Sequence, residues 1–576
     1  MKKHHASLLL LLFTLVLLLP GTAAQAAGPS APGDLIDLSG AVTNAQGKGV
    51  KEAQIEVFVG GQPYHFPDEA TAGRDGKYAV QIKLPAGAAE SSKIEVAVAK
   101  PSYRASAHLP LARLHAEGQD QAGNNRYLAQ LNVKLERTIS PAFWLSTLVL
   151  VVVYVLIAFE LMHRTLAALL GGALLLTISY TAGTFNSDYF ILSYEDAIRA
   201  IDMNVIFLLM AMMMIVGVMK KTGVFQWLAF KSYDVAKGNI FVLSTILMAI
   251  TAFCSAFLDN VTTMLLVIPV TLEIARTLKV DPVTLMLPEA FASNIGGTAT
   301  LIGDPPNIMI GSYAKLTFMD FVSNLALVNL ICLAISIVYF LWWYKKGYLK
   351  ADVGDVKKMT EHLRQEYKIT DAKLLAISGV ILATTIFLFI VHGALHMEPS
   401  VAALIGAAVL LVLSRVDIVE MLEHEIEWPT LVFFMMLFVV VSGAEEAGLI
   451  QIIADWVRDM SQGSLVAAVV LILWVSAIAS AFIDNIPFTA TMLPIVAYLT
   501  EVIPGAQGGV LWWSLALGAC LGGNGTMIGA SANVVTVGMA ERAGHPISFM
   551  QYMKAAFVPM LITVAICMAW LLAVEI

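Results

Sequence analysis

The sequence predicts a polytopic α-helical membrane protein with two inverted repeats, re-entrant hairpins and interrupted helices, preceded by a small extracytoplasmic β-sandwich domain at the N-terminus. The first observation is composition: 58% of the residues are apolar and 14% are charged, against about a quarter charged in an average soluble protein. The second is a series of uncharged runs near the ~20 residues that a membrane-spanning helix needs. The third is a set of polar motifs that occurs twice. A net charge of −8 offers no basic surface, so no nucleic-acid partner is expected.

The N-terminus carries the features of a secretion signal. Lys2 and Lys3 precede an apolar run at 8–19, and the small residues Ala24-Gln25-Ala26 follow it. This order predicts a signal peptide over residues 1–26. An uncleaved anchor helix is the alternative, although about a dozen apolar residues are short for a membrane span. Either interpretation places the next segment outside the cytoplasm.

Residues 31–133 are patterned as a β domain. Apolar and polar side chains alternate in four segments, which are 37–42, 53–59, 78–82 and 94–98. With turn residues between them, these segments predict a small antiparallel sandwich. The order of turn and strand residues resembles the carboxypeptidase-regulatory-like domain, in Gly40-x-Val42, Gly49-Val50, Ala53-x-Ile55 and Asp75-Gly76-Lys77-Tyr78. We therefore expect a binding or spacer module here.

An internal repeat organises the rest of the chain. Ser255-Ala256-Phe257-Leu258-Asp259-Asn260 returns 225 residues later as Ser480-Ala481-Phe482-Ile483-Asp484-Asn485. Gly296-Gly297-x-x-Thr300-x-Ile302-Gly303-x-x-x-Asn307 returns 226 residues later, from Gly522 to Asn533. Matched Asp, Asn and Gly positions over about 80 residues argue against chance similarity between apolar segments.

The repeat predicts transmembrane repeat 1 at 143–344 and transmembrane repeat 2 at 372–576. Lysines and arginines concentrate in the linker, 345–371, which should therefore be cytoplasmic. Lys220-Lys221 of the first repeat corresponds to Glu445-Glu446 of the second, which suits ends on opposite faces of the membrane. Inverted repeats of this kind are typical of secondary transporters, whose sites lie near the membrane midplane.

Both repeats interrupt their apolar runs at polar motifs. Asp259-Asn260 and Asp484-Asn485 predict unwound hairpin tips, where amide and carbonyl groups can face a cavity. A second break is predicted at the Gly-Gly motifs, where Pro305 and Pro306 push Asp304 out of helical geometry. Polar groups at membrane depth tend to be functional. The candidate ion- and substrate-binding residues are Asp259, Asn260, Thr262, Asn294, Gly296, Gly297, Thr298, Asp304, Asn307, Asp484, Asn485, Gly522, Gly523, Asn524, Thr526 and Asn533.

The four carboxylates of these segments, Asp259, Glu289, Asp304 and Asp484, have no Lys or Arg nearby in sequence. A bound Na⁺ or a proton can compensate each charge, and no other cofactor is expected. An anionic substrate would need half-helix N-termini or a co-bound cation, because these segments hold no guanidinium. The possible proton carriers are Asp259, Asp484 and Glu289. The possible Na⁺ ligands are Asn260, Thr298, Asn485 and Asn524.

Each assignment has a structural alternative. The duplicated Asp-Asn pairs can form hydrogen bonds between helices instead of binding an ion. Glu289 has no acidic counterpart, because Leu515 stands at its place in the second repeat. A structural pairing role for Glu289 therefore stays open.

The motif strings resemble the ion transporter superfamily, and within it the group that holds arsenite permeases, NhaD-type sodium/proton antiporters and the melanosomal P protein. The strings are those at 259–266, 294–307 and 518–535, and the resemblance spans about 204–576. It implies inverted repeats, re-entrant hairpins and a homodimer. The dicarboxylate/sodium symporters of the superfamily carry Ser-Asn-Thr at the hairpin tips. Asp259-Asn260-Val261 and Asp484-Asn485-Ile486 differ from that motif, which favours a titratable, ion-exchanging site over carboxylate recognition.

Together these observations predict a secondary active transporter of a small inorganic or organic ion, coupled to H⁺ or Na⁺, in the lipid bilayer of the cell (inner) membrane. Sodium/proton antiport and arsenite or anion permeation stay open, and a sodium-coupled carboxylate transporter is the nearest alternative. Two other classes are weighed. An intramembrane aspartyl protease would use two aspartates but usually carries Gly-x-Gly-Asp, and a receptor would sense through the β domain.

Overall fold

The computed structural model describes residues 33–576, apart from the stretches 45–46, 48, 51–52, 67–69, 74, 101–102, 112–113, 121–122, 352–360 and 362–366. The chain divides into two compact units, Met1–Thr138 and Ile139–Ile576. The predicted signal peptide lies outside the described residues, and part of the linker does too.

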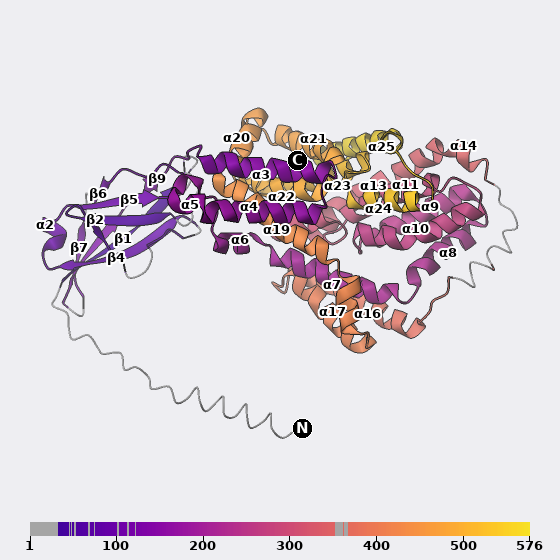
Figure 1. Cartoon of the computed structure of the whole chain (residues 1–576), viewed down its shortest axis with the longest axis horizontal. Coiled ribbons are helices and arrows are strands. Elements are labelled where there is room, and N and C mark those ends of the chain that lie inside the picture. The colour runs from indigo at the N-terminus through magenta and orange to yellow at the C-terminus, as the bar shows by residue number, and fades with distance from the viewer. Residues whose placement is uncertain are drawn as a thin grey trace, which may run out of the picture. The chain divides into compact units, whose positions relative to one another are not determined.

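The first unit is a β-sandwich whose two sheets share one apolar core (Figure 1). One sheet has the order β4-β1-β8-β7, with β9 beside β1, and the other has the order β3-β2-β5-β6. The strands of the first sheet are β1 (Gly33–Thr43), β4 (Lys77–Pro85), β7 (His115–Gln119), β8 (Asn125–Gln130) and β9 (Val133–Lys134). Those of the second are β2 (Gln54–Val59), β3 (Gln62–Tyr64), β5 (Ile94–Ala99) and β6 (Leu109–Pro110). All four predicted strand segments are strands.

The prediction of a purely antiparallel sandwich is wrong, because β1 pairs in parallel with β8 and with β9. After β4 the chain crosses to the other sheet for β5 and β6, and it then returns to the first sheet through β7. The next strand, β8, lies beside β1 on the side opposite β4 and runs in the same direction as β1. Parallel pairs need such a crossover, which alternation within single strands does not reveal.

An exposed ion pair joins β1 to β8. Arg126 Nε lies 2.7 Å from Asp37 Oδ2, and Gln81 Nε2 donates to Asp37 Oδ1 at 2.8 Å. Burial opposes the charge of Asp37, but the hydrogen bonds from Gln81 and Arg126 outweigh it and hold the pKa of this carboxyl below its ordinary value.

The second unit is helical. Its first half contains α3 (Pro141–Ala158), α4 (Arg164–Tyr180), α5 (Ala182–Phe185), α6 (Tyr194–Ala200), α7 (Met203–Lys220), α8 (Val224–Ala236), α9 (Ile240–Ser255), α10 (Asn260–Thr277), α11 (Val283–Thr298), α12 (Pro305–Ala314), α13 (Phe318–Trp343) and α14 (Lys345–Tyr348). Its second half contains α16 (Ala372–Val391), α17 (Pro399–Ser414), α18 (Ile418–Glu420), α19 (Trp428–Ala447), α20 (Leu449–Ser461), α21 (Leu465–Phe482), α22 (Asn485–Val502), α23 (Val510–Gly522), α24 (Ser531–Arg542) and α25 (Phe549–Trp570). Helices end and restart at each of the predicted breaks.

Eight helices of the described chain are long and apolar enough to cross a membrane, and these are α3, α4 continued by α5, α7, α13, α16, α19, α21 and α25 with the turn that follows it. The protein is therefore a multi-pass membrane protein. Many apolar side chains on these helices are exposed, for example Trp144 and Val380, as expected for surfaces that face lipid.

The two halves repeat each other's contacts and interlock (Figure 1). Helix α9 packs on α11 as α21 packs on α23, and α10 contacts α24 as α22 contacts α12. The first helical hairpin of each half packs on the other half. Helices α3 and α4 pack on α19 of the second half, whereas α16 and α17 pack on α7 of the first. Neither half is complete alone, which explains why both belong to one compact unit.

The Gly-Gly motifs allow this close packing. A Cβ on Gly296 would stand 2.0 Å from the carbonyl oxygen of Ala252 in α9, and one on Gly522 would stand 2.4 Å from that of Ala477 in α21. Gly297 and Gly523 similarly face the carbonyls of Gly303 and Gly529, at 2.7 and 2.6 Å. The structure gives these four glycines a packing function, because only a residue without Cβ fits there, and their role in binding stays a prediction.

Candidate functional site

The hairpin tips place both duplicated aspartates at the N-termini of helices. Asp259 accepts hydrogen bonds from the amides of Val261 and Thr262, at 2.9 and 3.0 Å, and also from the Thr262 hydroxyl. Asp484 accepts one from the amide of Ile486 at 3.0 Å. Both are therefore N-caps, of α10 and α22. An N-cap aspartate stabilises its helix, so the structural alternative accounts for at least part of this motif.

The second break differs between the repeats. Asp304 and its counterpart Ala530 both have extended backbones just before a helix, with φ of −140° and −148°. The prolines that follow Asp304 begin α12, as expected from their missing amide donors. Only the first repeat therefore carries a carboxylate at this position.

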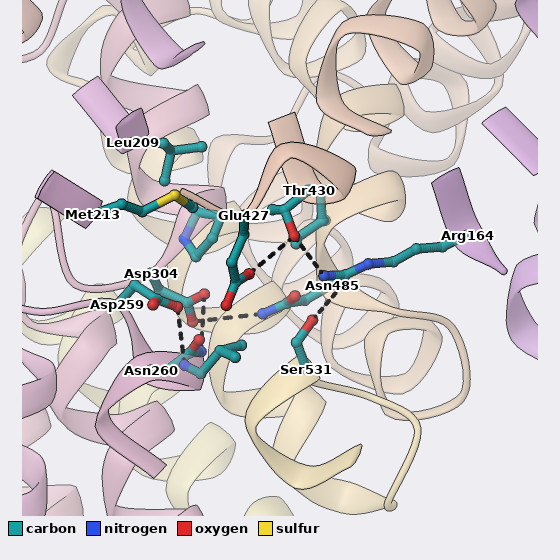
Figure 2. Close-up of a pocket in the computed structure, with 13 residues that line it drawn as sticks. Arg164, Leu209, Met213, Asp259, Asn260, Asp304, Glu427, Thr430, Asn485 and Ser531 are labelled. Atoms are coloured by element: carbon teal, nitrogen blue, oxygen red, sulfur yellow. Dashed lines mark hydrogen bonds between the residues drawn. The ribbon is translucent and has the colours of Figure 1, made fainter. Parts of the chain in front are cut away.

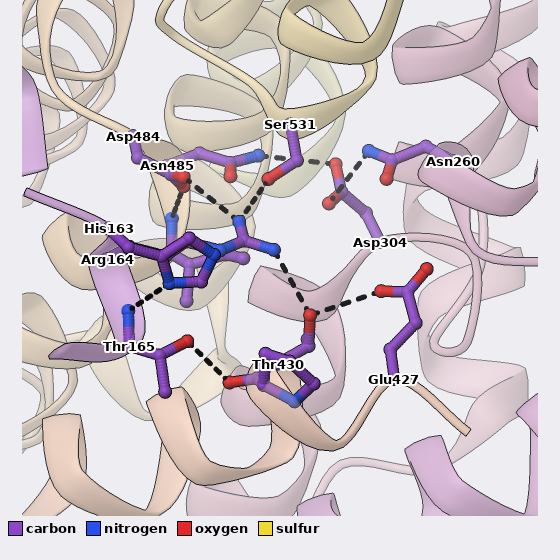
Figure 3. A network of polar contacts seen from close by, with 12 residues as sticks. His163, Arg164, Thr165, Asn260, Asp304, Glu427, Thr430, Asp484, Asn485 and Ser531 are labelled. Atoms are coloured by element: carbon purple, nitrogen blue, oxygen red, sulfur yellow. Dashed lines mark hydrogen bonds and ion pairs between the residues drawn. The ribbon is translucent and has the colours of Figure 1, made fainter. Parts of the chain in front are cut away.

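Asp304 lies where the two repeats meet (Figure 3). Its Oδ1 accepts from Asn260 Nδ2 at 3.3 Å, and its Oδ2 accepts from Asn485 Nδ2 at 3.5 Å. These two asparagines are the equivalent residues of the two hairpin tips. The Asp304 side chain is buried, with 1% of the residue exposed. A single carboxylate thus accepts hydrogen bonds from amide side chains of both repeats.

Behind Asp304 a network of amides continues across the repeat interface. Asn294 accepts from Asn260 at 3.3 Å and donates to Oδ1 of Asn524 and Asn533, at 2.8 and 3.0 Å. Asn533 Nδ2 in turn donates to the carbonyls of Gly523 and Thr526. Since all of these side chains are buried, their satisfied hydrogen bonds hold the broken helices in place.

The remaining predicted residues satisfy backbone groups in the same region. Asn307 Nδ2 donates to the carbonyls of Thr298 and Thr300, at 3.0 and 2.8 Å. The hydroxyl of Thr298 donates to the carbonyl of Asn294, and that of Thr526 to the carbonyl of Ala481. Their contacts indicate that they support the site.

A cavity of 20 Å³ lies against Asp304 (Figure 2). Four predicted residues line it, Asp259, Asn260, Asp304 and Asn485. Of the possible Na⁺ ligands, Asn260 and Asn485 line it, whereas Thr298 and Asn524 do not. A site needs about 10–15 Å³ to hold one water molecule, so this cavity has room for one water or one bare cation.

Sequence reasoning missed the arginine of the site. Arg164, the first residue of α4, donates to Ser531 Oγ at 2.8 Å and to Thr430 Oγ1 at 3.2 Å, and its Nη1 lies 3.6 Å from Asp484 Oδ2 (Figure 3). Because α4 packs on α19 of the other repeat, this guanidinium comes from far outside the segment that carries Asp484. Asp484 thus has a basic partner, which its own segment does not reveal.

A third carboxylate, Glu427, was also missed. It immediately precedes α19, lines the cavity, and accepts from Thr430 Oγ1 at 3.1 Å. Its counterpart 225 residues earlier is Asp202, the N-cap of α7. This matched pair of acids was a sequence signal that could have found it.

A larger hollow of 460 Å³, called the vestibule below, adjoins the cavity. Its polar lining includes Glu160, His163, Arg164, Asp484 and Ser531. Arg164, Val261 and Ser531 line both the vestibule and the cavity. These three side chains therefore lie between the cavity and the vestibule.

Glu289 is not among the residues that line either hollow. It is fully buried between α10 and α11, where both carboxyl oxygens accept from the Thr271 hydroxyl at 2.9 and 3.0 Å. Its surroundings fit the structural pairing role at least as well as the predicted carrier role.

Helices that span the membrane, two interlocked repeats and a buried polar cavity at their interface define a secondary transporter. Residues 154–518 match the family model CitMHS, described as citrate transporter. The chain belongs to this citrate transporter family.

Two curated relatives align with most of the chain. An uncharacterized transporter of Mycobacterium tuberculosis is 40% identical over 425 residues, which are 73% of this chain and 96% of the relative. The P protein of Homo sapiens is 34% identical over 519 residues, and the match covers 77% of this chain and 61% of that protein. The predicted resemblance to the group of the P protein is thereby confirmed. A solved structure, the YdaH transporter of Alcanivorax borkumensis, aligns with a TM-score of 0.44 at 13% identity, over 71% of this chain and 98% of that one.

Proposed function

We propose that the protein is a cation-coupled secondary transporter in which Asp304 holds the coupling ion, Na⁺ or H⁺, at the interface of the two repeats. The observation that carries the proposal is the position of Asp304, a buried carboxylate that receives one amide from each hairpin tip. A group that contacts both repeats can sense and bias their relative arrangement, as coupling requires.

The charges around the cavity favour a cation. Asp259, Asp304 and Glu427 line it, whereas Arg164 is the single basic side chain of the lining. An unpaired carboxylate buried at membrane depth costs several kcal/mol by order of magnitude. A proton or a Na⁺ ion in the cavity cancels such a charge.

The size of the cavity agrees with a small ion. A volume of 20 Å³ accepts one water-sized occupant, and no organic anion fits into it. Hard oxygen atoms suit Na⁺, and Asp304, Asn260 and Asn485, which line this space, carry carboxylate and amide oxygens. Asp259 and Asp484 remain candidate carriers in a supporting role, since their first function in the structure is helix capping.

A sodium-coupled carboxylate transporter is the second candidate. The vestibule measures 460 Å³ and contains the Arg164 guanidinium, a group that pairs well with carboxylates. The family description points the same way. In this version the cavity would hold the coupling ion while the vestibule would receive the anion.

Flux in proteoliposomes separates the candidates. Purified protein is reconstituted, and the lumenal pH and Na⁺ are followed after an inward Na⁺ gradient or a pH gradient is applied, with and without citrate, arsenite or chloride. An antiporter acidifies or alkalinises the lumen in response to Na⁺ alone, whereas a symporter needs the anion. Flux that is insensitive to both Na⁺ and pH would contradict the proposal.

The membrane location and assembly belong to the same proposal. The Lys-rich linker favours a cytoplasmic side for 345–371, and we expect residues 31–133 outside the cytoplasm of a cell (inner) membrane. A homodimer is the expected assembly. Cysteine accessibility at the linker and at the β domain in intact cells, and the mass of the detergent complex, test these points.

A further inference from the structure

One arginine separates the vestibule from the cavity. Arg164 lines both hollows, and its guanidinium touches three elements of the second repeat. These contacts are Thr430 in α19, the N-cap Asp484 of α22, and Ser531, the first residue of α24. The Phe433 ring also packs against it, 5.3 Å from the guanidinium carbon.

We propose that Arg164 is the gate of the ion cavity, holding its wall closed toward the vestibule and giving way when a cation enters. The inference rests on the proposed cation function and assigns Arg164 as a positioning residue for it. With the guanidinium in place, α4, α19, α22 and α24 are tied together around the cavity. Without it, the Thr430 and Ser531 hydroxyls and the Asp484 carboxylate lose the positive charge that links them.

The contacts of Arg164 are suited to opening. Its hydrogen bonds go to neutral hydroxyls, and its distance of 3.6 Å to Asp484 Oδ2 exceeds the 2.7–2.9 Å typical of a charge-assisted hydrogen bond. The ion pair is therefore attractive without being tight. A cation beside Asp304 repels the guanidinium across a poorly solvated space, where charges interact more strongly than in water. Occupancy of the cavity and closure of its wall are thus coupled reciprocally.

The equivalent place in the first repeat has no such gate. The residues that correspond to Thr430 and Ser531 are Val205 and Pro305, whose side chains cannot accept a hydrogen bond. Asp259, which corresponds to Asp484, is instead bonded within α10. The structure therefore assigns the gate to the side of the second repeat alone.

Labelling of a cysteine inside the cavity tests the gate. Leu209 lines the cavity and is 4% exposed, whereas Val534 lines only the vestibule and is 40% exposed. Leu209→Cys and Val534→Cys are each reacted with a small charged thiol reagent, with Arg164 intact and with Arg164→Gln. The four native cysteines are buried, so the unsubstituted protein gives the background.

We expect Arg164→Gln to accelerate labelling at 209 at least about tenfold, which corresponds to ~1.4 kcal/mol of closing free energy. Labelling at 534 should not change, and the exposed Arg542→Gln should leave both rates unchanged. Saturating Na⁺, or low pH with each rate divided by the rate at 534 to correct for the lower thiolate fraction, should accelerate labelling at 209 only when Arg164 is present. Arg164→Lys keeps the charge but cannot reach several partners, so an intermediate rate is expected.

An unchanged rate at 209 in Arg164→Gln, with the protein still monodisperse in detergent and reactive at 534, overturns the gate. If the rate rises but neither Na⁺ nor pH affects labelling or flux, Arg164 still holds the cavity closed, whereas its opening by a cation and the proposed cation function both fail. The two ideas are thus separated by one set of variants.

Discussion

The two repeats place the same residues, Asp259-Asn260 and Asp484-Asn485, at the same break between two helices, yet they differ where they meet. Asp304 and Asn294 of the first repeat correspond to Ala530 and Cys520 of the second. The duplicated residues cap helices and donate amides. The unduplicated Asp304 receives those amides. The duplicated motifs therefore account for the helix breaks and the amide donors of the site. The negative charge that accepts these amides comes from Asp304, which has no acidic counterpart in the second repeat.

The hairpin tips differ in a second way. Asp259 is bonded within its own helix, whereas Asp484 also faces Arg164, which the exchanged hairpin α3–α4 brings from the other half. Identical tip motifs thus have different electrostatic surroundings. This contrast leads to unequal effects when the charges are removed one at a time.

The largest effect is expected at Asp304. Asp304→Asn keeps the size of the side chain but removes the charge that faces both repeats, and a loss of about 3 kcal/mol corresponds to roughly a hundredfold lower rate. The measurement is Na⁺- or pH-driven flux in proteoliposomes. Asp281→Asn, at an exposed position before α11, is the control and should transport normally. If Asp304→Asn transports at the wild-type rate, the Asp304 carboxylate is not required for transport.

The two tips should respond unequally to neutralisation. Asp484→Asn removes the carboxylate that faces Arg164 and should lower the free energy of unfolding by about 2 kcal/mol. Asp259→Asn keeps a good N-cap and should cost well under about 1 kcal/mol. Thermal unfolding in detergent measures both. Adding Arg164→Gln to Asp484→Asn should recover much of the lost stability. If Asp484→Asn and Asp259→Asn lose the same stability, and Arg164→Gln recovers none of it, the two tips do not differ in their electrostatic surroundings.

Glu289 should tolerate its isosteric amide. Glu289→Gln keeps an acceptor for the Thr271 hydroxyl, so flux should stay within about threefold of wild type, whereas Glu289→Leu, the residue of the second repeat, should lose about 1 kcal/mol of stability. Flux and thermal unfolding together test this pair. Abolished transport in Glu289→Gln with normal folding would make Glu289 a proton carrier and extend the charged site beyond the repeat interface.

The smallest effect is expected for the exposed pair Arg126–Asp37, which serves as a baseline for the buried Arg164–Asp484 pair. Their side chains are 50% and 24% exposed, so Arg126→Gln should lower the stability of the β domain only slightly. Because the folded pKa of Asp37 is lowered, the stabilisation is present above the unfolded pKa and is lost as the pH falls through the folded one. Hydrogen exchange of β1 and β8 at neutral and acidic pH should show the difference between variant and wild type disappear in acid. A difference that persists in acid would mean that packing, not charge, sets the effect.

Much of the frame was predictable because its signals are local. Apolar runs of membrane length, glycine pairs and Asp-Asn motifs at a constant offset predicted the helices and the places where they break. Asn260 and Asn485 were named from sequence and lie at the cavity for this reason. The parallel partner of β1 could not be predicted, because alternation within a strand does not reveal its neighbour.

The sequence by itself determined the repeat, the broken helices and the set of polar side chains that had to be buried together, because periodicity and spacing are properties of neighbouring residues. Only the tertiary structure decided which charges meet. Arg164 and Asp484 are separated by more than half of the chain, and they come together because the first hairpin of one half packs on the other. The placement of Asp304 between two equivalent amides has the same origin. A contact between the repeats depends on how they pack together, and the sequence of one repeat does not determine that packing.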